Sequence, residues 1–151
     1  MDLNNIKRFY FIGIGGIGMS ALARYFKAKG FAVAGYDKTP SPLTGELEAE
    51  GIAIHFEDLG SQIPAEYQDT DSTLVVYTPA IPKTMGELVY VQQHHRVLKR
   101  SEVLGLITQT SKGLGVAGTH GKTTTSTMLA YVLSQSHQKC SAFLGGISSN
   151  F

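Results

Sequence analysis

The chain has 151 residues, of which 42% are hydrophobic, and a formal net charge of +1. It can therefore build an ordinary core, but it offers no field of one sign for a nucleic-acid or membrane-surface partner. No apolar run approaches the roughly 20 residues that span a bilayer, and the single cysteine, Cys140, excludes an internal disulfide framework. We expect a cytoplasmic protein that binds neither nucleic acid nor membrane.

The predicted elements follow the order strand, glycine turn, helix, repeated. Residues 8–14 form an apolar run typical of a parallel strand covered on both faces, and residues 17–29 continue with helical spacing up to Gly30. Further strands are expected at 31–36, 52–55, 73–78 and 97–98, and helices at 43–50, 85–94 and 101–110, with a loop or single helical turn within 57–71. After a linker at 111–113, we expect a strand at 114–117, a helix at 123–134 and a further strand at 142–144.

This alternation predicts an α/β fold. Residues 1–110 are expected to form a Rossmann-like, doubly wound parallel sheet with right-handed crossovers. Residues 111–151 are expected to begin a second unit with a strand, a phosphate-binding loop and a helix.

The first glycine loop, GIGGIG at 13–18, fits the pattern G-x-G-x-x-G between a predicted strand and a predicted helix. Glycines allow a sharp turn and close approach of a diphosphate, which the free N–H groups at the helix start can hold. Asp37 ends the next strand, where a carboxylate can accept hydrogen bonds from ribose hydroxyls. The ligand can be NAD or another nucleotide diphosphate, and the glycines can also serve only tight packing.

The second glycine loop, GTHGKT at 118–123, ends like a triphosphate loop, although Val116 stands where the general pattern has its first glycine. Lys122 can reach the β- and γ-phosphates and the Thr123 hydroxyl can bind Mg²⁺, while backbone N–H groups ring the phosphates. The alternative is that these threonines only cap a helix.

Together the two loops resemble the Mur ligase family of bacterial peptidoglycan synthesis. The resemblance is carried by FIGIGGIGMSALA at 11–23, GYDKT at 35–39, VVYTPAIP at 75–82, RSEVLG at 100–105 and GTHGKTTT at 118–125. Within the family the chain looks like the members that join L-alanine to UDP-N-acetylmuramate. The members that couple a recycled tripeptide to UDP-muramate share the second loop and remain an alternative.

The resemblance implies three domains: one for the UDP-sugar, a central ATPase and a closing third domain. The chain would then hold the first domain and the opening strand, loop and helix of the second, and would be inactive alone. In the whole enzyme, ATP would phosphorylate the muramate carboxylate, and the amine of L-alanine would displace phosphate from the acyl phosphate to give an amide. The implied partners are UDP-N-acetylmuramate, L-alanine and ATP with Mg²⁺, in cell wall biogenesis and cell division.

Carried over by position, the resemblance implies two sets of site residues. Those for the UDP-sugar are Gly13, Gly15, Gly16, Ile17, Gly18, Met19, Ser20, Asp37, Thr39, Thr78, Pro79, Ala80 and Ile81. Those for ATP are Gly118, Thr119, His120, Gly121, Lys122, Thr123 and Thr124, with Lys122 as the catalytic residue and Thr123 as the metal ligand. His120 is expected to shape the loop rather than take part in catalysis.

Two other functions fit parts of the sequence. A Rossmann module that binds NAD leaves GTHGKTTT unexplained, and a small P-loop kinase needs a longer sheet after Gly118.

Several other residues are expected at the surface. His55, His94 and His95 are expected on solvated surface, and Arg100 with Glu102 either forms a surface pair or orients the linker. Exposed apolar side chains on the last helix would favour self-association of the tail: Met128, Leu129, Val132 and Leu133.

Overall fold

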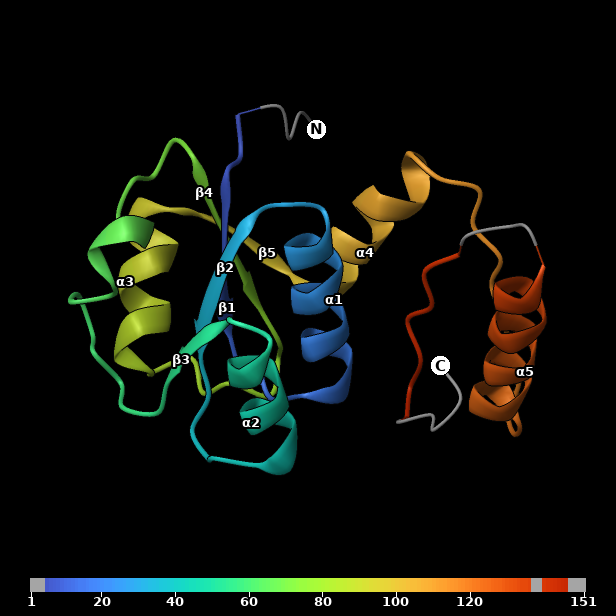
Figure 1. Ribbon diagram of the computed structural model, residues 1–151. Helices are drawn as coiled ribbons and strands as arrows, with labels where there is room; N and C mark the ends of the chain where they lie inside the picture. The colour runs from blue at the N-terminus through green and yellow to red at the C-terminus, as the bar shows by residue number, and fades with distance from the viewer. Residues whose placement is uncertain (1–4, 137–139, 147–151) are drawn as a thin grey trace.

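Five parallel strands form one sheet in the computed structural model, which describes residues 5–136 and 140–146. The strand order is β3-β2-β1-β4-β5 (Figure 1). The strands are β1 (Arg8–Ile12), β2 (Ala32–Tyr36), β3 (Ala53–His55), β4 (Thr73–Tyr77) and β5 (Arg96–Lys99). The helices are α1 (Ile17–Ala28), α2 (Pro42–Ala49), α3 (Gly86–His94), α4 (Arg100–Gln109) and α5 (Lys122–Gln135), with a 3-10 turn η1 (Ala65–Tyr67).

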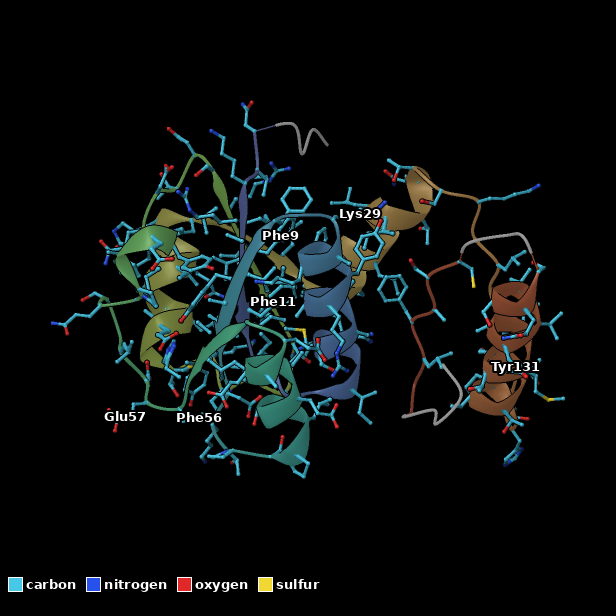
Figure 2. The ribbon with its side chains drawn as sticks, in the orientation of Figure 1. Phe9, Phe11, Lys29, Phe56, Glu57 and Tyr131 are labelled. Atoms are coloured by element: carbon cyan, nitrogen blue, oxygen red, sulfur yellow. The ribbon has the colours of Figure 1, made fainter. Side chains whose placement is uncertain are left out.

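Both faces of the sheet are covered because alternate side chains of its central strand are apolar. Phe9 and Phe11 point from β1 into a core shared with α1, α2 and α4 (Figure 2). Tyr10 and Ile12 point to the other face, into a core shared with α3 and η1. The Phe9 ring stacks on Phe26 of α1 with centroids 3.6 Å apart. Each fully buried side chain of this size stabilises the fold by roughly 1.5–3 kcal/mol.

The order of connections creates a switch point beside β1. The chain leaves β1 through α1 to β2 on one side, and later crosses to β4 on the other side. In a parallel sheet, ligands bind outside the carboxyl ends of the strands where the order reverses. That edge carries the segments that follow β1, β2, β4 and β5.

The predicted α/β class is confirmed, and the elements up to α4 lie where the sequence placed them, within one or two residues at most ends. Two predicted strands are wrong, because 114–117 and 142–144 are irregular. Their apolar residues favour a strand, but a strand also needs a neighbour for its backbone, and neither segment pairs with one within the described residues. Leu114 is 65% exposed.

Helix α5 stands apart from the sheet (Figure 1). Met128 and Val132 are 65% and 63% exposed on it, and Figure 2 shows Tyr131 on the same helix, far from the sheet. The Phe143 ring contacts Tyr25 of α1, with centroids 5.5 Å apart. No helix in the described ranges is long and apolar enough to cross a membrane.

Candidate functional site

The first glycine loop connects β1 to α1 and touches the segment after β4. Gly13 has φ +86°, a conformation that glycine adopts without strain. Its N–H and that of Ile14 donate to Tyr36 O at 2.8 and 3.0 Å. A Cβ on Gly13 would lie 3.1 Å from both Ile81 Cδ1 and Thr78 Cγ2. The loop and the Thr78–Ile81 turn therefore lie side by side, as the predicted site requires.

Asp37 organises the middle of this loop. Its Oδ2 accepts the Gly15 N–H at 2.7 Å, and its Oδ1 accepts the Thr39 N–H at 3.2 Å. A Cβ on Gly15 would lie 2.8 Å from Asp37 Oδ2 and from Thr44 Cγ2. Glycine is required here because the carboxylate sits directly against the loop. Both carboxylate oxygens thus already bind backbone, although each keeps a lone pair for a further donor.

The start of α1 keeps two N–H groups open. The Met19 and Ser20 N–H groups donate to Gly16 O at 2.9 and 2.8 Å. Ile17 and Gly18 have no acceptor for theirs among the described residues, as expected for the first turn of a helix. That turn contains no acidic residue. It therefore presents two donors and the positive end of the helix dipole to the carboxyl edge of the sheet.

Met19 and Ser20 serve the fold with their side chains. Met19 is 2% exposed and belongs to the core beside α1. The Ser20 hydroxyl donates to Ile17 O at 2.9 Å. Pro79 and Ala80 are exposed in a turn. The Ile81 N–H donates to Thr78 O across this turn.

The structure adds Arg100, which sequence reasoning did not assign to the site. Arg100 is the first residue of α4, directly after β5, and a Cβ on Gly18 would lie 2.8 Å from its Nη1 and 3.2 Å from its Cζ. Of the two alternatives for Arg100 and Glu102, the surface pair does not form within the described residues, where Glu102 Oε2 accepts the Lys99 N–H at 2.7 Å. The sequence held one indication of this position: Arg100 follows a predicted strand, and ligands bind at the carboxyl ends of parallel strands.

The second glycine loop lies directly before α5. Gly121 stands before the helix with φ +73°, and no side chain among the described residues caps the first turn. Within the described residues, Lys122, Thr123 and Thr124 have no acceptor for their N–H groups. Lys122 Nζ donates to Gly118 O at 2.6 Å and to Thr119 O at 3.3 Å. Thr119 and His120 are exposed.

A buried polar cluster lies on the α3 face of the sheet. Glu87, fully buried, accepts from the Tyr10 hydroxyl at 2.7 Å and the Leu59 N–H at 2.9 Å, and its Oε1 lies 2.7 Å from His55 Nε2. Burial, followed by the charge and hydrogen bond of Glu87, raises the pKa of Tyr10. The pattern of isolated polar residues in the sequence gave no sign of this cluster.

Two histidines correct the expectation of solvated surface. His55 belongs to the buried cluster, and its side chain is 23% exposed. His95 is 9% exposed, and its Nε2 lies 3.0 Å from Tyr67 O. Burial lowers the pKa of His95 more than this hydrogen bond raises it. Of the three histidines expected on the surface, His94 is exposed, as expected.

The fold, with one open glycine loop at its switch point and another before α5, is typical of doubly wound α/β domains that bind nucleotides. The model of the Mur ligase family, catalytic domain, matches residues 8–112. The chain belongs to the Mur ligase family, as the two loops predicted.

Two curated relatives show how similar the chain is to individual members of the family. The chain is 60% identical over 147 residues to UDP-N-acetylmuramate–L-alanine ligase from Porphyromonas gingivalis strain W83, covering 97% of the chain and 32% of that protein. It is 58% identical over 152 residues to the ligase of the same name from Phocaeicola vulgatus, covering 100% of the chain and 33% of that protein. The chain thus spans about a third of the length of these curated relatives.

Solved structures agree with the fold. A UDP-N-acetylmuramate–alanine ligase from Thermotoga maritima superposes with a TM-score of 0.82 at 33% identity, over 93% of this chain and 32% of that one. A ligase from Neisseria meningitides named for UDP-N-acetylmuramate and L-alanyl-γ-D-glutamyl-meso-diaminopimelate superposes with a TM-score of 0.77 at 30% identity, over 97% of this chain and 45% of that one.

Proposed function

We propose that this chain is the UDP-N-acetylmuramate-binding part of an ATP-dependent ligase that joins L-alanine to that nucleotide sugar in peptidoglycan synthesis. Relatives of that name, 58–60% identical over essentially the whole chain, support the substrate. The reaction belongs to a whole enzyme of the relatives' length, so we expect this chain alone to bind but not to turn over. We also propose that it works in the cytoplasm.

The observation that carries the proposal is the pair of open N–H groups of Ile17 and Gly18 at the switch point of the sheet. They suit the diphosphate, because two backbone donors and a helix dipole converge there. Gly13, Gly15 and Gly16 keep the turn free of side chains. Met19 and Ser20 act by holding the turn in place.

The segments on either side of the turn suit the rest of the nucleotide. We assign Asp37 and Thr39, after β2, to hold the ribose and uridine end. We assign the turn after β4 to line the ribose or uracil pocket, with Thr78, Pro79, Ala80 and Ile81. Thr78 and Ile81 already contact the glycine loop through the position of Gly13, which supports a continuous surface.

The second loop suits ATP. The open N–H groups of Lys122, Thr123 and Thr124 fit phosphate oxygens. Within the described residues Lys122 Nζ bonds only to carbonyls of its own loop, from which it can turn to a phosphate. Gly118 and Gly121 give the loop its turn, and Thr119 and His120 complete it. The Thr123 hydroxyl is the one Mg²⁺ ligand we assign, since no group of three acidic, histidine or cysteine residues that suits a metal occurs within the described residues. Mg²⁺ would neutralise phosphate charge there.

Two domains remain part of the proposal: a nucleotide-sugar domain at 1–110 and the start of an ATP-binding domain at 111–151. Residues 1–4 of the first lie outside the described residues, as do 137–139 and 147–151 of the second. Self-association through α5 also remains a proposal, supported by the exposure of Met128 and Val132. Size-exclusion chromatography with light scattering tests it: a monomer at every concentration would exclude it.

Binding tests the substrate. We expect calorimetry to give binding of UDP-N-acetylmuramate and UDP, and amide NMR spectra to show the Ile17 and Gly18 signals shifting with UDP while that of Gly45, in α2, stays in place. Tight NAD binding without UDP-sugar binding would reject the proposal in favour of a dinucleotide module.

The recycled-tripeptide alternative needs a different measurement, because the name of that relative also contains UDP-N-acetylmuramate. The two enzymes differ in the amine that they join to the nucleotide sugar. In an enzyme of the relatives' length carrying this chain, ADP release should depend on L-alanine and not on the tripeptide. The reverse dependence would reject L-alanine as the substrate.

A further inference from the structure

Arg100 occupies a position that is unfavourable for a cation unless an anion shares it. Its guanidinium lies against Gly18, at the start of α1, and Arg100 itself begins α4. Both helix starts carry partial positive charge, so each repels a cation. Arg100 is half-buried, and its side chain forms no ion pair or hydrogen bond within the described part of the chain.

Two acidic residues at the carboxyl edge of the sheet already accept backbone N–H groups. Asp37 binds the Gly15 and Thr39 N–H groups, and Glu102 binds the Lys99 N–H. The guanidinium lies against Gly18, and the N–H groups of Gly18 and its neighbour Ile17 have no acceptor among the described residues. Open backbone donors beside an arginine fork suit the oxygens of a phosphate group.

We propose that Arg100 is the counter-charge of the nucleotide diphosphate and makes this site select a diphosphate over an uncharged nucleoside. This inference rests on the proposed function, because it takes its ligand from it. The same geometry explains why the last residue of the loop is glycine. Gly18 leaves room for the guanidinium, since a Cβ there would lie 2.8 Å from Nη1.

The test compares Arg100→Gln and Arg100→Lys with a matched control, Arg24→Gln. Arg24 also lies on the α1 side of the sheet, but it is paired with Glu46 and Glu50. The ligands are UDP, uridine and inorganic pyrophosphate, measured by calorimetry at two salt concentrations.

We expect Arg100→Gln to weaken UDP binding by tenfold or more, Arg100→Lys to weaken it less, and Arg24→Gln to change it by less than twofold. Uridine binding should be the same in all four proteins. Added salt should weaken UDP binding more in the wild type than in Arg100→Gln. The ligand-free Arg100→Gln protein should unfold at the same temperature as the wild type or higher, because the repulsion from the helix starts is removed.

The outcomes separate the inference from the function beneath it. Equal UDP binding by the wild type and Arg100→Gln overturns the role of Arg100 and leaves the proposed function standing. Pyrophosphate binding that depends on Arg100, without UDP binding, keeps the anion site and overturns the nucleotide sugar. Binding of neither ligand by the wild type overturns both. A lower unfolding temperature with unchanged UDP binding would make Arg100 a structural residue.

Discussion

Replacing Gly18 with alanine should raise stability and weaken ligand binding at the same time. Gly18 is the second residue of α1, where alanine is favoured over glycine by about 0.5–1 kcal/mol. The new methyl group would lie 2.8 Å from Arg100 Nη1. Only the far end of a flexible side chain must move, so the cost to the fold is small and most of the helix gain remains.

Gly18→Ala should have the opposite effect on ligand binding. Moving the guanidinium removes a charge-assisted hydrogen bond to the diphosphate, worth about 1.5–3 kcal/mol. At 1.4 kcal/mol per factor of ten, UDP should bind roughly ten- to a hundredfold more weakly. Thermal unfolding followed by circular dichroism should give a midpoint about 1–4 °C higher than the wild type.

Gly105→Ala is the matched control for this variant. Gly105 lies inside α4, and a Cβ there would meet nothing within 4 Å. It should raise the unfolding midpoint to a similar degree and leave UDP binding unchanged. If Gly18→Ala lowers the midpoint and binds UDP as the wild type does, the contact between Gly18 and Arg100 has no role in recognition.

Other variants test separate parts of the structure. Glu87→Leu should lower the free energy of unfolding in urea by about 3 kcal/mol or more, because it leaves the buried donors without an acceptor, whereas Glu57→Leu, at an exposed position (Figure 2), should have little effect; equal effects would contradict the burial argument. Burial alone would raise the pKa of Asp58, but N–H groups that include that of Gly86 lower it overall. The stability that Asp58 contributes should therefore be present above the pKa of the unfolded state, about 4, and be lost as the pH falls through the lower pKa of the folded state. Asp58→Asn should flatten this part of the curve of unfolding free energy against pH. Lys122→Ala should leave both UDP affinity and the unfolding midpoint unchanged, because in the described part of the chain Nζ bonds only within its own exposed loop; a shift in either would show that the two loops are coupled in this chain.

The sequence predicted the sheet well because each strand has a recognisable local pattern of residues. The apolar runs at β1 and β4 and the glycines after the helices suffice to order the elements. The strands expected at 114–117 and 142–144 failed because pairing is not a local property: an apolar segment forms a strand only where another strand offers its backbone.

The site was predictable only in part, for a similar reason. The glycine loop and Asp37 form a pattern of fixed spacing, so their proximity can be read from the chain. Arg100 lies far along the sequence from Gly18, and only the strand order brings β5 to the same edge of the sheet. Glu87 and His55 are brought together by the fold alone, since nothing in their local sequence marks a buried pair.

The position of Asp37 divides the glycine loop into two parts with different tasks. Its carboxylate accepts the Gly15 N–H, so the first part of the loop is already neutralised by protein and would repel an added anion. The second part, with the Ile17 and Gly18 N–H groups and Arg100, carries uncompensated positive charge. A diphosphate is therefore favoured on the β4 and β5 side of the turn, with the ribose hydroxyls free to face the carboxylate. If the diphosphate sat instead against Gly15, Asp37 would have to leave its 2.7 Å hydrogen bond, and Asp37→Asn would then strengthen UDP binding rather than weaken it.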